Sequence, residues 1–224
     1  AVEFKDHRPY RIYSIAVNTS QTDRTFPKPD QLRDDIMEAV VDFAFRDEPI
    51  APDAQTRIFV NPGGPLRLGG PSVHSGLTGR KNAIDTYGGF SRNSGSALSG
   101  KDPMRIDRVG AYMARYAAKN VVAAGLAEQC EVLLSYTIGL AKPASIQVET
   151  MGTGKIPDEE IAQRVRQHFD FSLTGILSQF NLRRLPSLTK GGFFRKLAAY
   201  GHFGRTDFDV PWERTDKVDV LKEG

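Results

Sequence analysis

Hydrophobic and polar positions predict a strand, a helix and a second strand in the first part of the chain. Tyr10–Val17 (YRIYSIAV) is apolar and β-branched enough to predict a strand. Pro29–Arg46 predicts an amphipathic helix with Asp30 as its cap. Its apolar residues recur at helical spacing: Leu32, Ile36, Ala39, Val40 and Phe43. Thr56–Val60 predicts a short strand.

The same patterning predicts a long helix later in the chain. Ile106–Ala124 is rich in alanine and carries apolar residues at helical spacing. Asp102 and Pro103 precede it, as a capping residue and a first-turn proline commonly do. Gly125 follows it in the position where glycine often ends a helix.

A hairpin and two further helices are predicted after this long helix. Cys130–Gly139 and Ser145–Met151 predict two strands joined through a Lys-Pro turn. Pro157–His168 and Ser172–Phe180 predict helices. The polar C-terminal stretch, Phe203–Gly224, is expected to wrap the surface.

The middle of the chain, Gly63–Gly100, is dense in glycine, serine and threonine and has almost no apolar periodicity. Loops of this length inside a compact domain are usually functional or disordered. Because this stretch also holds basic residues and the aromatic residues Tyr87 and Phe90, we interpret it as functional.

Composition narrows the classes of partner. The chain has 224 residues and a formal net charge of +3, which fits one large or two small domains. Such a small basic excess argues against a general nucleic-acid coat but leaves room for a local phosphate site. The single cysteine, Cys130, excludes an intramolecular disulfide and favours a reducing compartment. We expect a cytoplasmic protein that binds neither nucleic acid nor membrane, since signal-peptide and membrane-spanning patterns are absent from the sequence.

The first candidate site is the glycine-rich run Gly69–Lys81 (GGPSVHSGLTGRK). Glycines let a backbone approach a ligand closely and turn its amides inward. Arg80 offers a planar fork for phosphate oxygens, and Lys81 a point charge. The spacing does not match a Walker loop. Two interpretations therefore stay open, a phosphate site and a solvated loop with a chance basic pair.

The second candidate site is Ser99–Asp107 (SGKDPMRID), at the start of the predicted long helix. Lys101, Arg105 and Asp107 supply two cations and one carboxylate where helix amides and the helix dipole attract anions. This set suits a metal–polyphosphate ligand, with Asp107 holding the metal. The alternative is an ordinary helix start with surface charges.

Several long motifs together resemble the S-adenosylmethionine synthetase (methionine adenosyltransferase) family. GLTGRK, DTYGG, SGKDP and AAYGHFGR occur in the family's order and spacing, and Tyr112–Ala127 and Ser135–Ala141 are also similar. The resemblance covers nearly the whole chain. It implies an α+β fold of mixed, mostly antiparallel sheets covered by helices, with part of a pseudo-threefold domain arrangement. The implied domains are a remainder of the first α/β domain (1–66), a glycine-rich central segment (67–108) and a C-terminal α/β domain (109–224).

The resemblance also implies a reaction, in which ATP and L-methionine give S-adenosylmethionine with the release of triphosphate. Mg²⁺ and K⁺ would be its cofactors. The polyphosphate contacts would come from Arg80, Lys81, Lys101 and Arg105, while Asp107 would bind Mg²⁺ and Ala97 would lie against ATP. Arg105 stands where the family usually has lysine, which keeps the charge but changes the donor geometry.

Some of the family's substrate and cation ligands are absent or altered. The His-Pro-Asp-Lys motif, the acidic K⁺ ligand and an Asp-x-Lys do not occur at matching positions in this sequence. His74 stands in place of an aspartate that binds the substrates. Leu66 stands in place of a phenylalanine that stacks on adenine, so it keeps apolar contact without the aromatic face.

These departures suggest a shared active site, because family members build each site between two subunits. The chain would then be one component of a homo- or hetero-oligomer and would need another synthetase chain to complete its site. A second interpretation is a catalytically degenerate scaffold or regulatory subunit. A third is a piece of an ordinary full-length enzyme.

Overall fold

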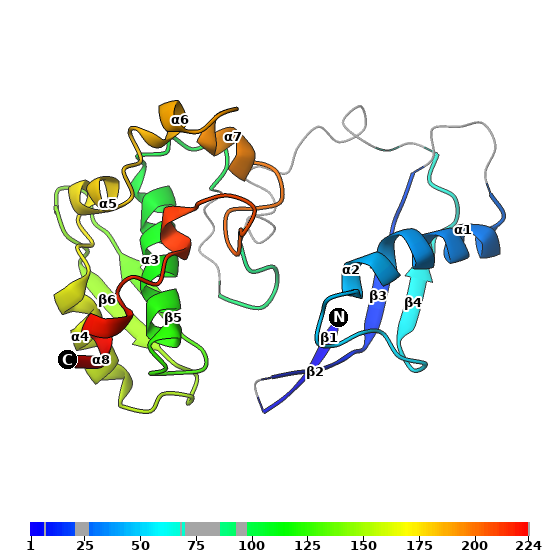
Figure 1. The fold of residues 1–224 in the computed structure, drawn as a ribbon, viewed down its shortest axis with the longest axis horizontal. Helices are drawn as coiled ribbons and strands as arrows, with labels where there is room; N and C mark the ends of the chain where they lie inside the picture. The colour runs from blue at the N-terminus through cyan, green and yellow to red at the C-terminus, as the bar shows by residue number, and fades with distance from the viewer. Residues whose placement is uncertain (7, 21–26, 68, 70–85, 93–97, 224) are drawn as a thin grey trace. The chain divides into compact units, whose positions relative to one another are not determined.

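The structure, a computed structural model, describes residues 1–6, 8–20, 27–67, 69, 86–92 and 98–223. The chain forms two compact units, Ala1–Gly76 and Leu77–Gly224 (Figure 1). Within the described residues, no helix combines the length and the apolar character that crossing a bilayer requires.

The first unit contains two small strand pairs. The predicted strand over Tyr10–Val17 is divided at Tyr13 into β2 (Arg8–Ile12) and β3 (Ser14–Val17). β2 pairs antiparallel with β1 (Val2–Lys5), whereas β3 pairs parallel with β4 (Arg57–Val60), the second predicted strand. Because of this division, one stretch of chain pairs with two different strands.

A single helical stretch covers the β3–β4 pair, as the apolar spacing predicts. It comprises α1 (Pro29–Ile36), the π-helical segment η1 (Met37–Asp42) and α2 (Phe43–Phe45). The prediction that Asp30 caps it was wrong. Lys28 holds the N-cap position without a side-chain cap, because Pro29 already supplies a preformed first-turn angle and places Asp30 inside the helix.

The second unit is built around α3 (Ile106–Ala123), which runs through its middle in Figure 1. The predicted hairpin is present as β5 (Glu131–Ser135) paired antiparallel with β6 (Ser145–Glu149). α3 packs against β5, and α4 (Asp158–His168) packs against β6. α5 (Leu173–Gln179) begins after Ser172, whose hydroxyl accepts a hydrogen bond from the Gly175 amide. The α+β class is thereby confirmed.

The C-terminal stretch corrects the sequence prediction, because it enters the core instead of only wrapping the surface. After α6 (Leu185–Leu188) and α7 (Phe193–Leu197), the chain forms η3 (Pro211–Glu213) and α8 (Val218–Glu223). Trp212 and Leu221 are fully buried. The Trp212 ring stacks on Tyr112 of α3, with centroids 3.6 Å apart and planes inclined by 6°. The tail therefore fills the centre of the second unit.

The end of α3 confirms the predicted stop. Gly125 has a φ of +72°, a left-handed conformation that glycine adopts without steric cost. Its amide donates to Val122 O (2.9 Å), and the Leu126 amide donates to Val121 O (3.3 Å). This pair of bonds is the Schellman arrangement, which satisfies the last carbonyls of the helix.

Candidate functional site

Two consecutive turns place Lys101 just before the start of α3. Leu98 is buried and anchors the first turn, in which the Lys101 amide donates to Leu98 O (3.4 Å). Gly100 has a φ of +83°, the conformation that a type II turn needs at its third residue. In the second turn Asp102 accepts from the Met104 amide through Oδ1 (2.8 Å) and from the Arg105 amide through its carbonyl (3.0 Å).

These turns correct the expected cap of α3. Arg105 is the N-cap residue, with extended backbone angles and no side-chain cap, and the helix begins at Ile106. Asp102 caps the preceding turn instead, because its carboxylate reaches an amide only two residues ahead. An exposed arginine therefore stands at the positive end of an 18-residue helix.

Lys101 and Asp107 meet across the start of α3. Lys101 Nζ lies 3.5 Å from Asp107 Oδ2, and their side chains are 31% and 45% exposed. An ion pair this open to water is weak. A ligand can therefore replace it, with Lys101 binding an anion and Asp107 binding a cation. The structure thus brings Lys101, Arg105 and Asp107 together within one helix start, as the sequence predicts.

The other predicted site residues are distributed differently. Leu66 lies in the first unit, where it forms a parallel bridge with Ser20 and is 41% exposed. Four predicted residues lie outside the described residues, so their positions stay predictions: His74, Arg80, Lys81 and Ala97.

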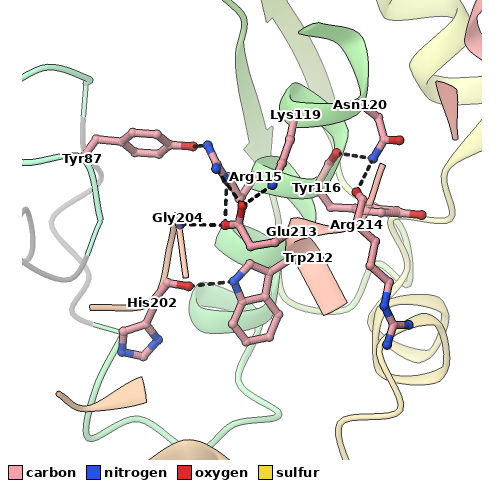
Figure 2. Close-up of polar contacts among 10 residues, drawn as sticks. All are labelled: Tyr87, Arg115, Tyr116, Lys119, Asn120, His202, Gly204, Trp212, Glu213 and Arg214. Atoms are coloured by element: carbon pink, nitrogen blue, oxygen red, sulfur yellow. Dashed lines mark hydrogen bonds and ion pairs between the residues drawn. The ribbon is translucent and has the colours of Figure 1, made fainter. Parts of the chain in front are cut away.

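A buried charge cluster that the sequence analysis missed lies farther along α3 (Figure 2). Glu213 is 8% exposed and accepts from Arg115 through both carboxylate oxygens (3.0 and 2.8 Å) and from Lys119 (2.7 Å). Arg115 also donates to Tyr87 Oη (2.8 Å). The four-residue spacing of Arg115 and Lys119 puts both on one helix face, but nothing in the sequence links them to Glu213.

The electrostatics of this cluster depend on one carboxylate that two cations share. Burial alone raises the pKa of the Glu213 carboxyl, but hydrogen bonds from Arg115 and Lys119 outweigh it, and that pKa stands below its ordinary value. Burial likewise raises the pKa of the Tyr87 phenol. Glu213 is therefore an ionised carboxylate that Arg115 and Lys119 share, and it offsets one of their two positive charges.

Comparison with known proteins identifies the family. The model of the S-adenosylmethionine synthetase C-terminal domain matches residues 68–214. The chain belongs to the S-adenosylmethionine synthetase family. S-adenosylmethionine synthases of Synechococcus sp. (strain JA-2-3B'a(2-13)) and Trichormus variabilis are each 50% identical to it over an alignment of 228 positions, which covers 99% of this chain's residues. The alignments cover 55% and 54% of the two relatives, so the chain spans about half the length of the curated relatives it matches.

A solved structure agrees with this identification. An unusual S-adenosylmethionine synthetase from Campylobacter jejuni superimposes with a TM-score of 0.85 at 36% sequence identity. The match covers 97% of this chain and 55% of that one. The fold expected of a synthetase is thus confirmed for nearly the whole chain.

The second unit also has a cavity of about 1330 Å³, lined chiefly by α3, β5 and the residues that follow β5. Asp107 is among its lining residues. Among the described residues, the cations in its lining are Arg92, Arg115 and Lys119, and each of them pairs with a carboxylate. Asp107 thus belongs both to the cavity lining and to the ion pair with Lys101 at the start of α3.

The described residues fit Mg²⁺ only in a particular way. They contain no group of three or more His, Cys, Asp or Glu side chains that could hold a metal by themselves. Asp107 instead offers one partly exposed carboxylate beside cations. Mg²⁺ often binds in this way, through one or two carboxylates together with substrate phosphates and water. The donor set at α3 therefore suits magnesium that arrives with a polyphosphate, whereas the described residues offer K⁺ no acidic cluster.

Proposed function

We propose that this chain is a component of S-adenosylmethionine synthetase, which converts ATP, L-methionine and water to S-adenosylmethionine, phosphate and diphosphate. Lys101, Arg105 and Asp107 would contribute triphosphate and Mg²⁺ ligands, with Arg80 and Lys81 beside them. The observation that carries this proposal is the exposed Lys101–Asp107 pair at the start of α3, in a chain 50% identical to named synthases.

The chemistry explains why these groups would be needed. When the methionine sulfur attacks the ribose 5′ carbon, the bond to triphosphate breaks and negative charge develops on the leaving oxygen. Cations that are already aimed at this position stabilise the transition state without reorganising. Lys101 and Arg105 would hold phosphate oxygens there, and Asp107 would hold Mg²⁺. When bound, Mg²⁺ neutralises part of the triphosphate charge.

We further propose that another synthetase chain completes the site, in a homo- or hetero-oligomer. Support comes from the sequence, which replaces two of the family's substrate contacts with His74 and Leu66. The second candidate, a degenerate scaffold, is favoured by the two replacements but not by the retained Lys101 and Asp107.

Binding of inorganic tripolyphosphate with Mg²⁺ to the 224-residue chain, measured by calorimetry, tests the half-site. We expect Lys101→Ala to weaken binding about 10- to 100-fold, the loss typical of one charge-assisted hydrogen bond. Lys142→Ala is the matched control. Lys142 carries the same charge, is exposed, and lies in the β5–β6 connection, far from Lys101 in the sequence. Equal affinities of the two variants would contradict the proposed site.

Synthesis of S-adenosylmethionine tests the shared site. The chain would be assayed alone and with a synthetase chain that carries the His-Pro-Asp-Lys motif, and native mass spectrometry would report the assembly. We expect activity only in the mixture. We also expect that activity to be lost when this chain carries Lys101→Ala. Full activity of the chain alone, in a sample that native mass spectrometry shows to be monomeric, would rule out sharing. An active mixture that tolerates Lys101→Ala would favour the scaffold.

A further inference from the structure

The loop between α7 and η3 is held in place from the C-terminal side. Trp212 Nε1 donates to the His202 carbonyl (2.8 Å), and the Gly204 amide donates to Glu213 Oε1 (2.9 Å) (Figure 2). Gly201 and Gly204 have φ values of +87° and +71°, which allow the chain to turn sharply on both sides of His202. The backbone of His202 is therefore held by hydrogen bonds that do not involve its own side chain.

The His202 side chain joins this loop to two other segments. The residue is fully buried. Its Nδ1 lies 2.8 Å from Tyr112 Oη on α3, and its Nε2 lies 2.8 Å from Ser99 Oγ in the turn that precedes Lys101. One imidazole thus connects residues that are 103 and 90 positions away from it in the sequence.

Arg108 completes a closed circuit of hydrogen bonds. It is 4% exposed, and its Nε donates to Tyr112 Oη (2.8 Å) while its Nη1 donates to the Lys101 carbonyl (2.7 Å). Its guanidinium also lies 4.9 Å from the Phe194 ring centroid on α7. Ser99 and Lys101 are therefore both held by the same set of side chains, on either side of Gly100.

The proton positions in this circuit follow from the chemistry of each group. Arginine can only donate, so Tyr112 Oη accepts from Arg108 and can direct its own proton to Nδ1 of His202. An accepting Nδ1 leaves the imidazole proton on Nε2, which then donates to Ser99 Oγ. In this arrangement a neutral imidazole satisfies both neighbours without placing a second positive charge beside buried Arg108.

We infer that His202 is a positioning residue for Lys101, acting through Ser99 on one side and through Tyr112 and Arg108 on the other. The circuit fixes the backbone of Lys101 relative to α3. Asp107 lies in the first turn of that helix, and Arg105 is its N-cap residue. The ligand role of Lys101 rests on the proposed function, whereas the positioning itself is a property of the described fold.

Hydrogen–deuterium exchange of the 224-residue chain tests the positioning without any ligand. His202→Phe removes both hydrogen bonds but keeps a ring, and Tyr112→Phe removes one hydroxyl while keeping the stack on Trp212. We expect the Lys101 and Arg105 amides, which are bonded to Leu98 and Asp102, to exchange about tenfold faster in both variants. Ile161→Val, a buried change on α4, is the control for a general loss of stability.

His202→Gln is the conservative variant. Its amide offers one acceptor and one donor, which can replace the two ring nitrogens between Tyr112 and Ser99. We expect it to restore most of the exchange protection that His202→Phe loses. The inference is overturned if exchange at Lys101 and Arg105 is unchanged in His202→Phe and Tyr112→Phe, or if Ile161→Val accelerates it equally.

Tripolyphosphate binding with Mg²⁺ then connects positioning to ligand affinity. We expect His202→Phe to weaken binding about tenfold, and His202→Gln to bind more tightly than His202→Phe. Unchanged affinity in His202→Phe, with faster exchange, would show that the positioning does not serve the ligand and would overturn that part. If the unmodified chain binds no tripolyphosphate, the proposed function fails, while the exchange measurement still decides whether His202 positions Lys101.

Discussion

Glu213 shows how one residue can make a buried charge tolerable. Its carboxylate accepts from Arg115, Lys119 and the Gly204 amide, so most of its hydrogen-bonding capacity is used inside the protein. Burying a carboxylate is costly, but removing a partner costs more because it leaves the opposite charge without compensation. Glu213 therefore stabilises the junction of α3 with the C-terminal segment mainly through its ion pairs with Arg115 and Lys119.

Glu213→Gln is expected to reduce the free energy of unfolding by about 3 kcal/mol at pH 7, because the partly buried Arg115 and Lys119 lose the counter-charge that they share. The lowered pKa of Glu213 means that its contribution is complete above the ordinary value of 4.5 and is lost as the pH falls through the folded-state value. The loss of stability below about pH 4.5 should therefore be smaller in the variant.

Urea unfolding between pH 7 and pH 3 would measure this difference. Glu223→Gln, an exposed change on α8, serves as the control and should follow the unmodified chain. Parallel pH profiles for Glu213→Gln and the unmodified chain would show that the carboxylate contributes no acid-sensitive stability.

The elements show where sequence patterns are sufficient and where they are not. The long helix was predicted almost to the residue at its C-terminal end, because Gly125 is a local signal that acts through its own φ. The predicted caps Asp30 and Asp102 were wrong, since a carboxylate near a proline can stabilise either a helix start or a turn. The strand over Tyr10–Val17 was divided because pairing, which is not local, decides where a strand ends.

Gly125→Ala is expected to lower the free energy of unfolding by about 1 kcal/mol, because an L-residue is strained in the left-handed conformation. Gly125→Asn should cost less, since asparagine tolerates that conformation better. Thermal or urea unfolding of both variants checks the order. An alanine variant as stable as the unmodified chain would mean that the helix end can relax out of the Schellman arrangement.

At the scale of the whole molecule, the apolar core is divided very unequally. Among the described residues, the buried apolar side chains of the first unit are Ile12 and Val41. The large core cluster lies entirely in the second unit, from Leu98 to Leu221. Little buried apolar area leaves little free energy to offset chain entropy, so the first unit should open more readily.

Hydrogen exchange across the whole chain should therefore show two levels of protection. We expect amides of α3 and α4 to be the slowest, and amides of α1 and β4 to exchange at least about 100-fold faster. Mass spectrometry of peptides after timed labelling would measure both. Equal protection of the two units would show that the first unit gains stability that its own core does not explain.

The site as a whole was only partly predictable. Lys101, Arg105 and Asp107 lie within seven residues of one another, so a capped-helix pattern was enough to bring them together. Their support was not foreseeable, because His202 and Glu213 reach α3 from about 90 to 100 positions away. Contacts over such separations are set by how the core packs, which no local pattern of residues encodes.

The stack of Trp212 on Tyr112 has an optical consequence. Trp212 is the only tryptophan of the chain, and it is fully buried in the core of the second unit. Its fluorescence will therefore report the integrity of that unit, while the first unit has no indole with which to emit. A single emission trace can follow the packing of the loop that carries His202, because the indole N–H is bonded to that residue's carbonyl. The chain thus contains its own light-emitting probe beside the backbone that positions Lys101.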